Sequence, residues 1–179
     1  KALPYESDNL AIGMYGKEED FFTLKGVVVE LLNKLGIKDI QFIAETEYGV
    51  YHPGRCARIV ATHMAELENG PMEEEVELGI MGEVHPEVTE NYGIGTRCYV
   101  AELMFENVTE LSNTTKAYTQ LPKFPAMVRD IALVADEEMT VGQIEAVITE
   151  SATELLRSVK LFDIYRGQQV GEGKKSMAF

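Results

Sequence analysis

The sequence lacks the marks of a membrane or secreted protein. No apolar run is long enough to cross a bilayer as a helix. The first ten residues, KALPYESDNL, have neither a basic start nor an apolar stretch, so no secretory signal is expected. Cys56 and Cys98 are the only cysteines and show no C-x-x-C spacing, which predicts small buried side chains in a reducing compartment. We therefore expect a cytoplasmic protein.

The chain also lacks the basic excess that is usual in nucleic-acid-binding proteins. Its formal net charge is −14. Residues 1–120 hold 9 Lys and Arg against 21 Asp and Glu, whereas residues 121–179 hold 7 against 9. The acidity thus belongs to the first part, and the second part is near neutral. Its last stretch carries five cations: Arg157, Lys160, Arg166, Lys174 and Lys175.

Several motifs of catalysis are missing. No G-x-x-x-x-G-K-[ST] occurs, and no G-x-G-x-x-G follows a predicted strand and opens a helix. The segment 171–175, GEGKK, joins two predicted strands and is typical of a β-turn. Ser176 follows two lysines but has no apparent base beside it, so a nucleophilic role is not expected.

The three histidines have no spacing of a compact metal site. His52 and His85 each precede a proline, which favours turn-forming or capping roles. A metal site could be imagined only by combining distant residues: His52, His63 and His85 with Glu47, Glu83 and Glu87.

Residues 1–111 read as one α+β module with an antiparallel sheet. Asp20 is expected to cap a helix of apolar residues at helical spacing, which Gly36 ends. Pro86 is expected to start a short helix, and one helical turn is expected after residue 105. Strands are expected at 10–16, 40–45, 58–64, 75–84 and 97–105, with a turn at 68–71.

A polar segment with two prolines, residues 112–126, is predicted to be a linker. Residues 127–179 then read as strand, helix, strand and the start of a third strand. The strands are expected at 129–137, 158–166 and 174–179, and Thr140 is expected to cap a helix that carries Val141, Ile144, Val147, Ile148, Leu155 and Leu156. This order is the first part of a ferredoxin-like βαββαβ domain, which we expect to be truncated after the start of its third strand.

Five segments resemble the C-terminal portion of the β subunit of bacterial phenylalanyl-tRNA synthetase. Three look like its ferredoxin-fold, RRM-like anticodon-binding domain: RDIALVADE (129–137), LFDIYRG (161–167) and GEGKKSMAF (171–179). Two are similar to the catalytic-like module just upstream: YHPGRCARI (51–59) and LGIMGEVHPEV (78–88). The resemblance covers essentially the whole chain, and the motifs stand in the family's order.

The resemblance implies a part in an (αβ)₂ heterotetramer that attaches phenylalanine to its tRNA. In that family the α subunit binds ATP, phenylalanine and Mg²⁺ and performs the chemistry. The catalytic-like module of β shares the synthetase fold without catalytic residues and supports α. The terminal domain reads the anticodon of the phenylalanine tRNA. This chain is therefore expected to hold no catalytic residue, metal or cofactor of its own.

Tyr165 is the leading candidate for RNA contact. A tyrosine at the end of a sheet strand offers a flat face on which an unstacked base can lie. The residues alone leave a half-buried structural tyrosine equally open, but the resemblance matches Tyr165 to the family's anticodon-stacking tyrosine. It also matches Ser176 to a residue that hydrogen-bonds an anticodon base.

Three further candidates are weaker. Asp163 lies two residues before Tyr165, on the same predicted face, and could accept a hydrogen bond from a base amino group. Arg129 and Lys175 could contact phosphates, although Arg129 could equally pair with an acidic neighbour.

Two other functions compete with the RNA reader. One is a protein-interaction module whose sheet never contacts RNA, which the net charge of −14 favours. The other is an independent enzyme, such as a metal hydrolase that uses the histidines. An inaccessible Tyr165 would favour the first alternative, and a converging cluster of histidines and glutamates would favour the second.

Overall fold

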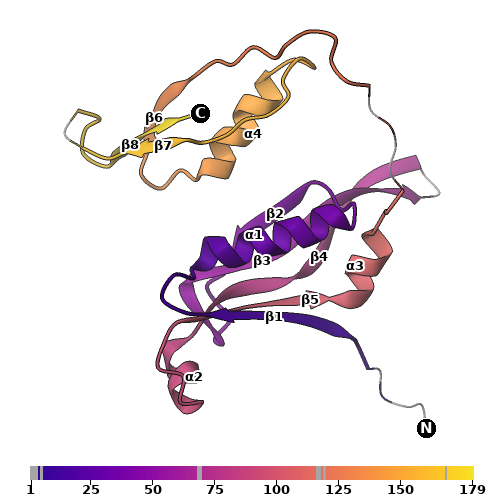
Figure 1. Cartoon of the computed structure of the whole chain (residues 1–179), viewed down its shortest axis with the longest axis vertical. Coiled ribbons are helices and arrows are strands. Elements are labelled where there is room, and N and C mark those ends of the chain that lie inside the picture. Colours follow the sequence, from indigo (N-terminus) through magenta and orange to yellow (C-terminus); the bar gives the residue numbers. More distant parts are fainter. Residues whose placement is uncertain (1–3, 5, 68–69, 116–117, 119, 168) are drawn as a thin grey trace. The chain divides into compact units, whose positions relative to one another are not determined.

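The computed structural model describes residues 4, 6–67, 70–115, 118, 120–167 and 169–179. The chain divides into two compact units, Lys1–Tyr118 and Thr119–Phe179, each with its own sheet (Figure 1). None of the described helices is both long and apolar enough to cross a membrane.

The first unit is built on a five-stranded antiparallel sheet in the order β1-β5-β4-β3-β2. Two short helices, α2 (Pro86–Asn91) and α3 (Phe105–Leu111), follow β4 and β5. The strands are β1 (Asn9–Tyr15), β2 (Ile40–Ala44), β3 (Tyr51–Leu67), β4 (Gly70–Val84) and β5 (Cys98–Met104). The expected α+β fold of this part is confirmed.

Helix α1 (Phe21–Lys34) lies along this sheet (Figure 1) and buries Leu24, Val28 and Leu32 in its core. The carboxylate of Asp20 caps the helix by accepting from the backbone N–H of Thr23 at 2.7 Å. That bond, joined by the Thr23 hydroxyl, lowers the pKa of Asp20. Gly36 follows the helix at φ +79°, a left-handed conformation that favours glycine. Both predicted ends of the helix are confirmed.

Strand β3 is longer than the predicted strand at 58–64. It begins at Tyr51 and includes the His52-Pro53-Gly54 segment, for which a turn was expected. The segment forms a bulge, because Tyr51 pairs with Val84 whereas Cys56 pairs with Gly82. Proline has no N–H for the ladder, so an irregular pairing accommodates it. The predicted turn at 68–71 lies partly outside the described residues.

The second unit contains β6 (Ala132–Asp136), α4 (Val141–Ser151), β7 (Asp163–Tyr165) and β8 (Lys174–Ala178). Its sheet is antiparallel with the order β6-β8-β7. Met177 of β8 is fully buried at the centre of a small core with Ile144 of α4 and Phe179. The predicted strand–helix–strand–strand order is confirmed.

Two predicted elements of this unit are too long. Helix α4 ends at Ser151, so the expected contributions of Leu155 and Leu156 to it are wrong, and Leu155 is exposed. The strand expected over 158–166 is only Asp163–Tyr165. The expected strand would place Val159 and Leu161 on the face of Tyr165, but both pack into the core together with Ile164. One regular strand cannot place both Leu161 and Ile164 on the same face, because they are three residues apart.

The expected linker, residues 112–126, contains no helix or strand among its described residues. Residues 116, 117 and 119 lie outside the described part. Asn113 still belongs to the first unit, because its N–H donates to the Leu35 carbonyl at 2.8 Å. Beyond it Leu121 and Phe124 are strongly exposed.

Candidate nucleic-acid interface

The second sheet has one face toward α4 and one face toward solvent. The inner face carries Leu133, Ile164 and Met177, which pack with the helix. The register places the next residues on the outer face. Tyr165 pairs with Ser176, and Ser176 pairs with Val134, so the three form one row across the sheet. We call Val134, Ser176 and Tyr165 the outer row.

The outer row is accessible. Val134 is 58% exposed and Tyr165 is 44% exposed, while Ser176 between them is half-buried. Asp163 is exposed one pleat along β7 and pairs with Ala178. The predicted shared face of Asp163 and Tyr165 is thus present. An apolar and aromatic surface with a hydroxyl at its centre can stack a base and hydrogen-bond its edge.

The two expected phosphate contacts are placed differently. Arg129 is exposed, and its Nη1 donates to the Val128 carbonyl at 3.0 Å. Lys175 is buried on the inner side of β8, where its Nζ donates to the Glu137 carbonyl at 2.6 Å. Lys175 would have to break this hydrogen bond to contact a phosphate, so in this structure its side chain has a structural role.

Two other cations near the sheet already have carboxylate partners. Arg166 Nε lies 2.8 Å from Glu137 Oε1, and Lys174 Nζ lies 3.8 Å from Asp136 Oδ1. These groups are about half exposed or more, so the pairs add little stability but offset the positive charge locally. The outer face therefore offers groups for stacking and hydrogen bonding, but little net positive charge to attract phosphates.

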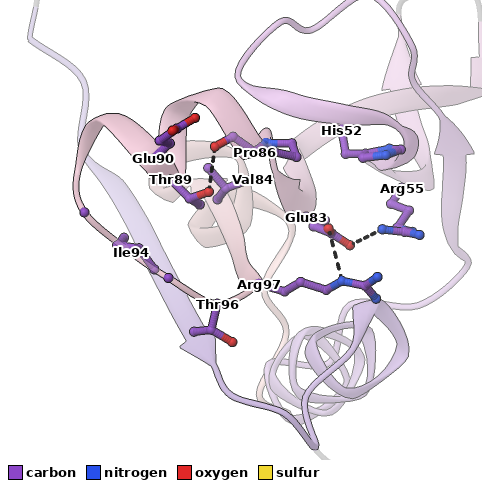
Figure 2. A pocket seen from close by; sticks show the side chains of 12 residues that line it. His52, Arg55, Glu83, Val84, Pro86, Thr89, Glu90, Ile94, Thr96 and Arg97 are labelled. Carbon is purple, nitrogen blue, oxygen red and sulfur yellow. Dashed lines mark hydrogen bonds and ion pairs between the residues drawn. The ribbon is translucent and has the colours of Figure 1, made fainter.

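The first unit contains an open pocket of about 900 Å³ beside the end of β4, lined also by α2 and the loop that leads to β5 (Figure 2). Glu83 is the buried acid of this pocket. Its Oε2 lies 2.7 Å from Arg55 Nη1, and its Oε1 lies 3.7 Å from Arg97 Nε. Figure 2 shows the two guanidinium groups approaching this carboxylate from different segments. Among the described residues no buried side-chain nitrogen or oxygen lacks a hydrogen-bond partner.

The histidines have local structural roles. His85 caps α2, and its Nδ1 accepts from the Glu87 N–H at 3.3 Å. His52 Nδ1 accepts from the Gly54 N–H at 3.1 Å. The predicted capping role is confirmed for His85, whereas His52 lies in the irregular part of β3 and not in the expected turn. His63 lies 3.8 Å from Glu74. The described residues contain no group of three or more histidine, cysteine or acidic side chains that could hold a metal ion.

Both cysteines are free thiols in the first unit. Cys56 is buried in the sheet, and burial is the main reason that its pKa rises to about 11, with a smaller effect of Glu45. Burial also raises the pKa of Cys98. A raised pKa keeps a thiol protonated and unreactive near neutral pH.

Comparison with known families matches both units. Residues 1–105 match the model of the phenylalanyl tRNA synthetase beta chain CLM domain. The chain belongs to this synthetase β-chain family. Residues 122–179 match the ferredoxin-fold anticodon binding domain, which contains the outer row. The chain is thus a part of a phenylalanine–tRNA ligase β subunit that includes an anticodon-binding ferredoxin-fold domain.

Curated relatives agree with this assignment. The chain is 40% identical over 179 residues to the phenylalanine–tRNA ligase beta subunit of Clostridium tetani, which covers 100% of this chain and 21% of that protein. It is 41% identical over 177 residues to the subunit of Clostridium acetobutylicum, covering 99% and 21%. For Bacillus subtilis the identity is 40% over 163 residues, covering 91% and 19%. The chain spans about a fifth of the length of these relatives.

Sequence reasoning missed the arginines around Glu83 and the contacts of Glu137. It named Glu83 only as a possible metal ligand and did not name Arg55 or Arg97. Arg55 lies 28 residues from Glu83, and no short motif joins them. It also missed Glu137, whose carboxylate and carbonyl bind Arg166 and Lys175.

Proposed function

We propose that this chain is a non-catalytic part of a phenylalanine–tRNA ligase that recognises the anticodon of the phenylalanine tRNA. The outer row carries this proposal, because an exposed tyrosine lies beside a serine hydroxyl on a sheet face that no core residue occupies. The match of residues 122–179 to an anticodon-binding family supports it.

In this mechanism unstacked anticodon bases lie on the outer face of the second sheet. Tyr165 supplies the surface on which a base stacks, and Ser176 donates to or accepts from the edge of that base. Asp163 accepts from an exocyclic amino group of a neighbouring base. Arg129 contacts the phosphate backbone, whereas a contact from Lys175 requires release of the Glu137 carbonyl.

The first unit has a supporting role in this proposal. It docks the α subunit, which holds ATP, Mg²⁺ and phenylalanine and forms the aminoacyl ester in an (αβ)₂ heterotetramer in the cytoplasm. Residues 1–120 carry 9 basic against 21 acidic side chains, and this negative charge repels RNA from the first unit.

The proposal is tested by binding of a labelled anticodon stem-loop of the phenylalanine tRNA across a salt series. Tyr165→Ala should weaken binding about 5- to 150-fold, because stacking of one base contributes about 1–3 kcal/mol. Binding should also weaken with salt, because backbone contacts release counterions. A stem-loop with a substituted anticodon should bind less well than the native loop.

Tyr92→Ala is the matched control, because Tyr92 is 79% exposed and lies in the first unit. It should leave binding unchanged. Equal binding of native and substituted loops, unaffected by Tyr165→Ala, would show non-specific contact and contradict the proposal.

One observation favours a second candidate, a protein-interaction module without RNA contact. Lys174, Lys175 and Arg166 all have partners within the second unit, which leaves few cations for phosphates. Complete absence of stem-loop binding, both by the chain alone and by the assembled synthetase, would favour this candidate.

A further inference from the structure

Tyr165 turns its ring back over its own chain, toward Gly167. A Cβ added to Gly167 would lie 2.6 Å from Cζ of Tyr165 and 3.1 Å from Cε1, with the Tyr165 hydroxyl oxygen closer still. Real Cβ atoms essentially never approach another heavy atom as closely as the contacts with Cζ and the hydroxyl oxygen. The ring therefore occupies the space that any side chain at position 167 would need.

Backbone conformation does not explain this glycine. The positive-φ glycines of the second unit are Gly171 and Gly173, among the described residues, and Gly167 is not one of them. An alanine at 167 is therefore compatible with the backbone. The remaining constraint is the Tyr165 ring, which fills the space that a side chain at position 167 would occupy.

Residues next to Gly167 make two contacts within the second unit. Arg166 Nε binds the Glu137 carboxylate at 2.8 Å, and the Glu137 N–H donates to the Gly173 carbonyl at 2.9 Å. On the other side, the N–H of Val170 donates to the Gly167 carbonyl at 3.1 Å. Because the clashing atoms belong to the far end of the Tyr165 side chain, a clash at 167 is relieved most easily by movement of the ring.

We propose that Gly167 is a positioning residue that seats the Tyr165 ring for base stacking. This inference rests on the proposed function. The space left by the missing side chain at 167, which we call the seat, holds the ring in one orientation before RNA binds, while Tyr165 remains 44% exposed for a base. A preorganised side chain loses less conformational freedom on binding.

The test is Gly167→Ala, which keeps every side chain of the proposed interface. It should weaken binding of the anticodon stem-loop about 2- to 10-fold, the factor that corresponds to one newly immobilised side chain. In protein labelled with 3-fluorotyrosine, the ¹⁹F signal of Tyr165, assigned by its loss in Tyr165→Phe, should shift in the RNA-free variant. The other seven of the eight tyrosines should keep their signals.

Gly142→Ala is the matched control. Gly142 lies in α4, no atom lies within 4 Å of a Cβ placed there, and its φ is not positive. It should change neither the fluorine signal of Tyr165 nor binding. A double-variant cycle adds a second test. Tyr165→Phe removes the hydroxyl oxygen, which is the nearest atom of the clash. Adding Gly167→Ala to Tyr165→Phe should therefore weaken binding by a smaller factor than adding Gly167→Ala to the unmodified chain.

Two results would overturn the inference. An unchanged Tyr165 signal in Gly167→Ala would show that the ring does not rely on the seat. A shifted signal with full binding, while Tyr165→Ala still weakens binding, would show that ring position is irrelevant to recognition. If Tyr165→Ala itself leaves binding intact, the proposed function fails, and the role of Gly167 in RNA binding fails with it. The fluorine signal then reports on the seat alone.

Discussion

At the scale of single residues, Glu83 shows how a buried charge is kept in the first unit. Its side chain is 5% exposed, and the guanidinium of Arg55 meets it at 2.7 Å. Breaking such a pair costs more than the pair contributes, because the remaining partner loses its compensation. Arg55 is 41% exposed and can be rehydrated, which limits that cost.

We expect Glu83→Gln to destabilise the first unit by about 1.5–3 kcal/mol, the range for a hydrogen bond to a charged group. The measurement is urea unfolding followed by circular dichroism. Glu77→Gln is the matched control. Its pair with Arg58 spans 3.1 Å, but both side chains are 40% exposed, so a change of at most about 1 kcal/mol is expected. Equal effects of the two substitutions would refute this account of Glu83.

At the scale of elements, α4 depends on its N-terminal cap. The Thr140 hydroxyl accepts from the Gln143 N–H at 3.3 Å, and the Gln143 side chain accepts from the Thr140 N–H at 2.8 Å. Together they form a capping box at the start of an eleven-residue helix. The helix contributes Ile144 to the small core under the second sheet.

Thr140→Ala should therefore destabilise the second unit by about 1 kcal/mol. Thr149→Ala, in the same helix, should be neutral or slightly stabilising. Thr149 is exposed and its hydroxyl bonds only to the Glu145 carbonyl, and alanine is the better helix former. The thermal unfolding midpoint of each variant tests this contrast, and the opposite ranking would disprove the capping role.

Elements with a local signal were predictable from the sequence. The caps Asp20 and Thr140 identified the starts of α1 and α4, and Gly36 identified the end of α1. The length of β7 was not predictable. Alternation over 158–166 fits a strand, but tertiary packing takes both Leu161 and Ile164 into the core and breaks the period of two. The bulge at Pro53 likewise depends on pairing with β4, which is far along the chain.

At the scale of the whole molecule, the two units divide the charge and the chemistry. The first unit is acidic and holds the larger core, and the second is near neutral and presents the outer row. Sequence reasoning found Tyr165 and Ser176 through the family resemblance, and the register makes them neighbours. It could not find Gly167 or Glu137, because their roles depend on where a ring and an ion pair lie in space.

The central claim is that the outer face of the second sheet contacts the anticodon. Chemical-shift mapping of the isotope-labelled chain during titration with the anticodon stem-loop tests it most directly. We expect the largest perturbations at Tyr165, Ser176 and Asp163, and small ones at Ile144 on the helix side. Perturbations centred on α4 or on the first unit, with the outer row unchanged, would contradict the account.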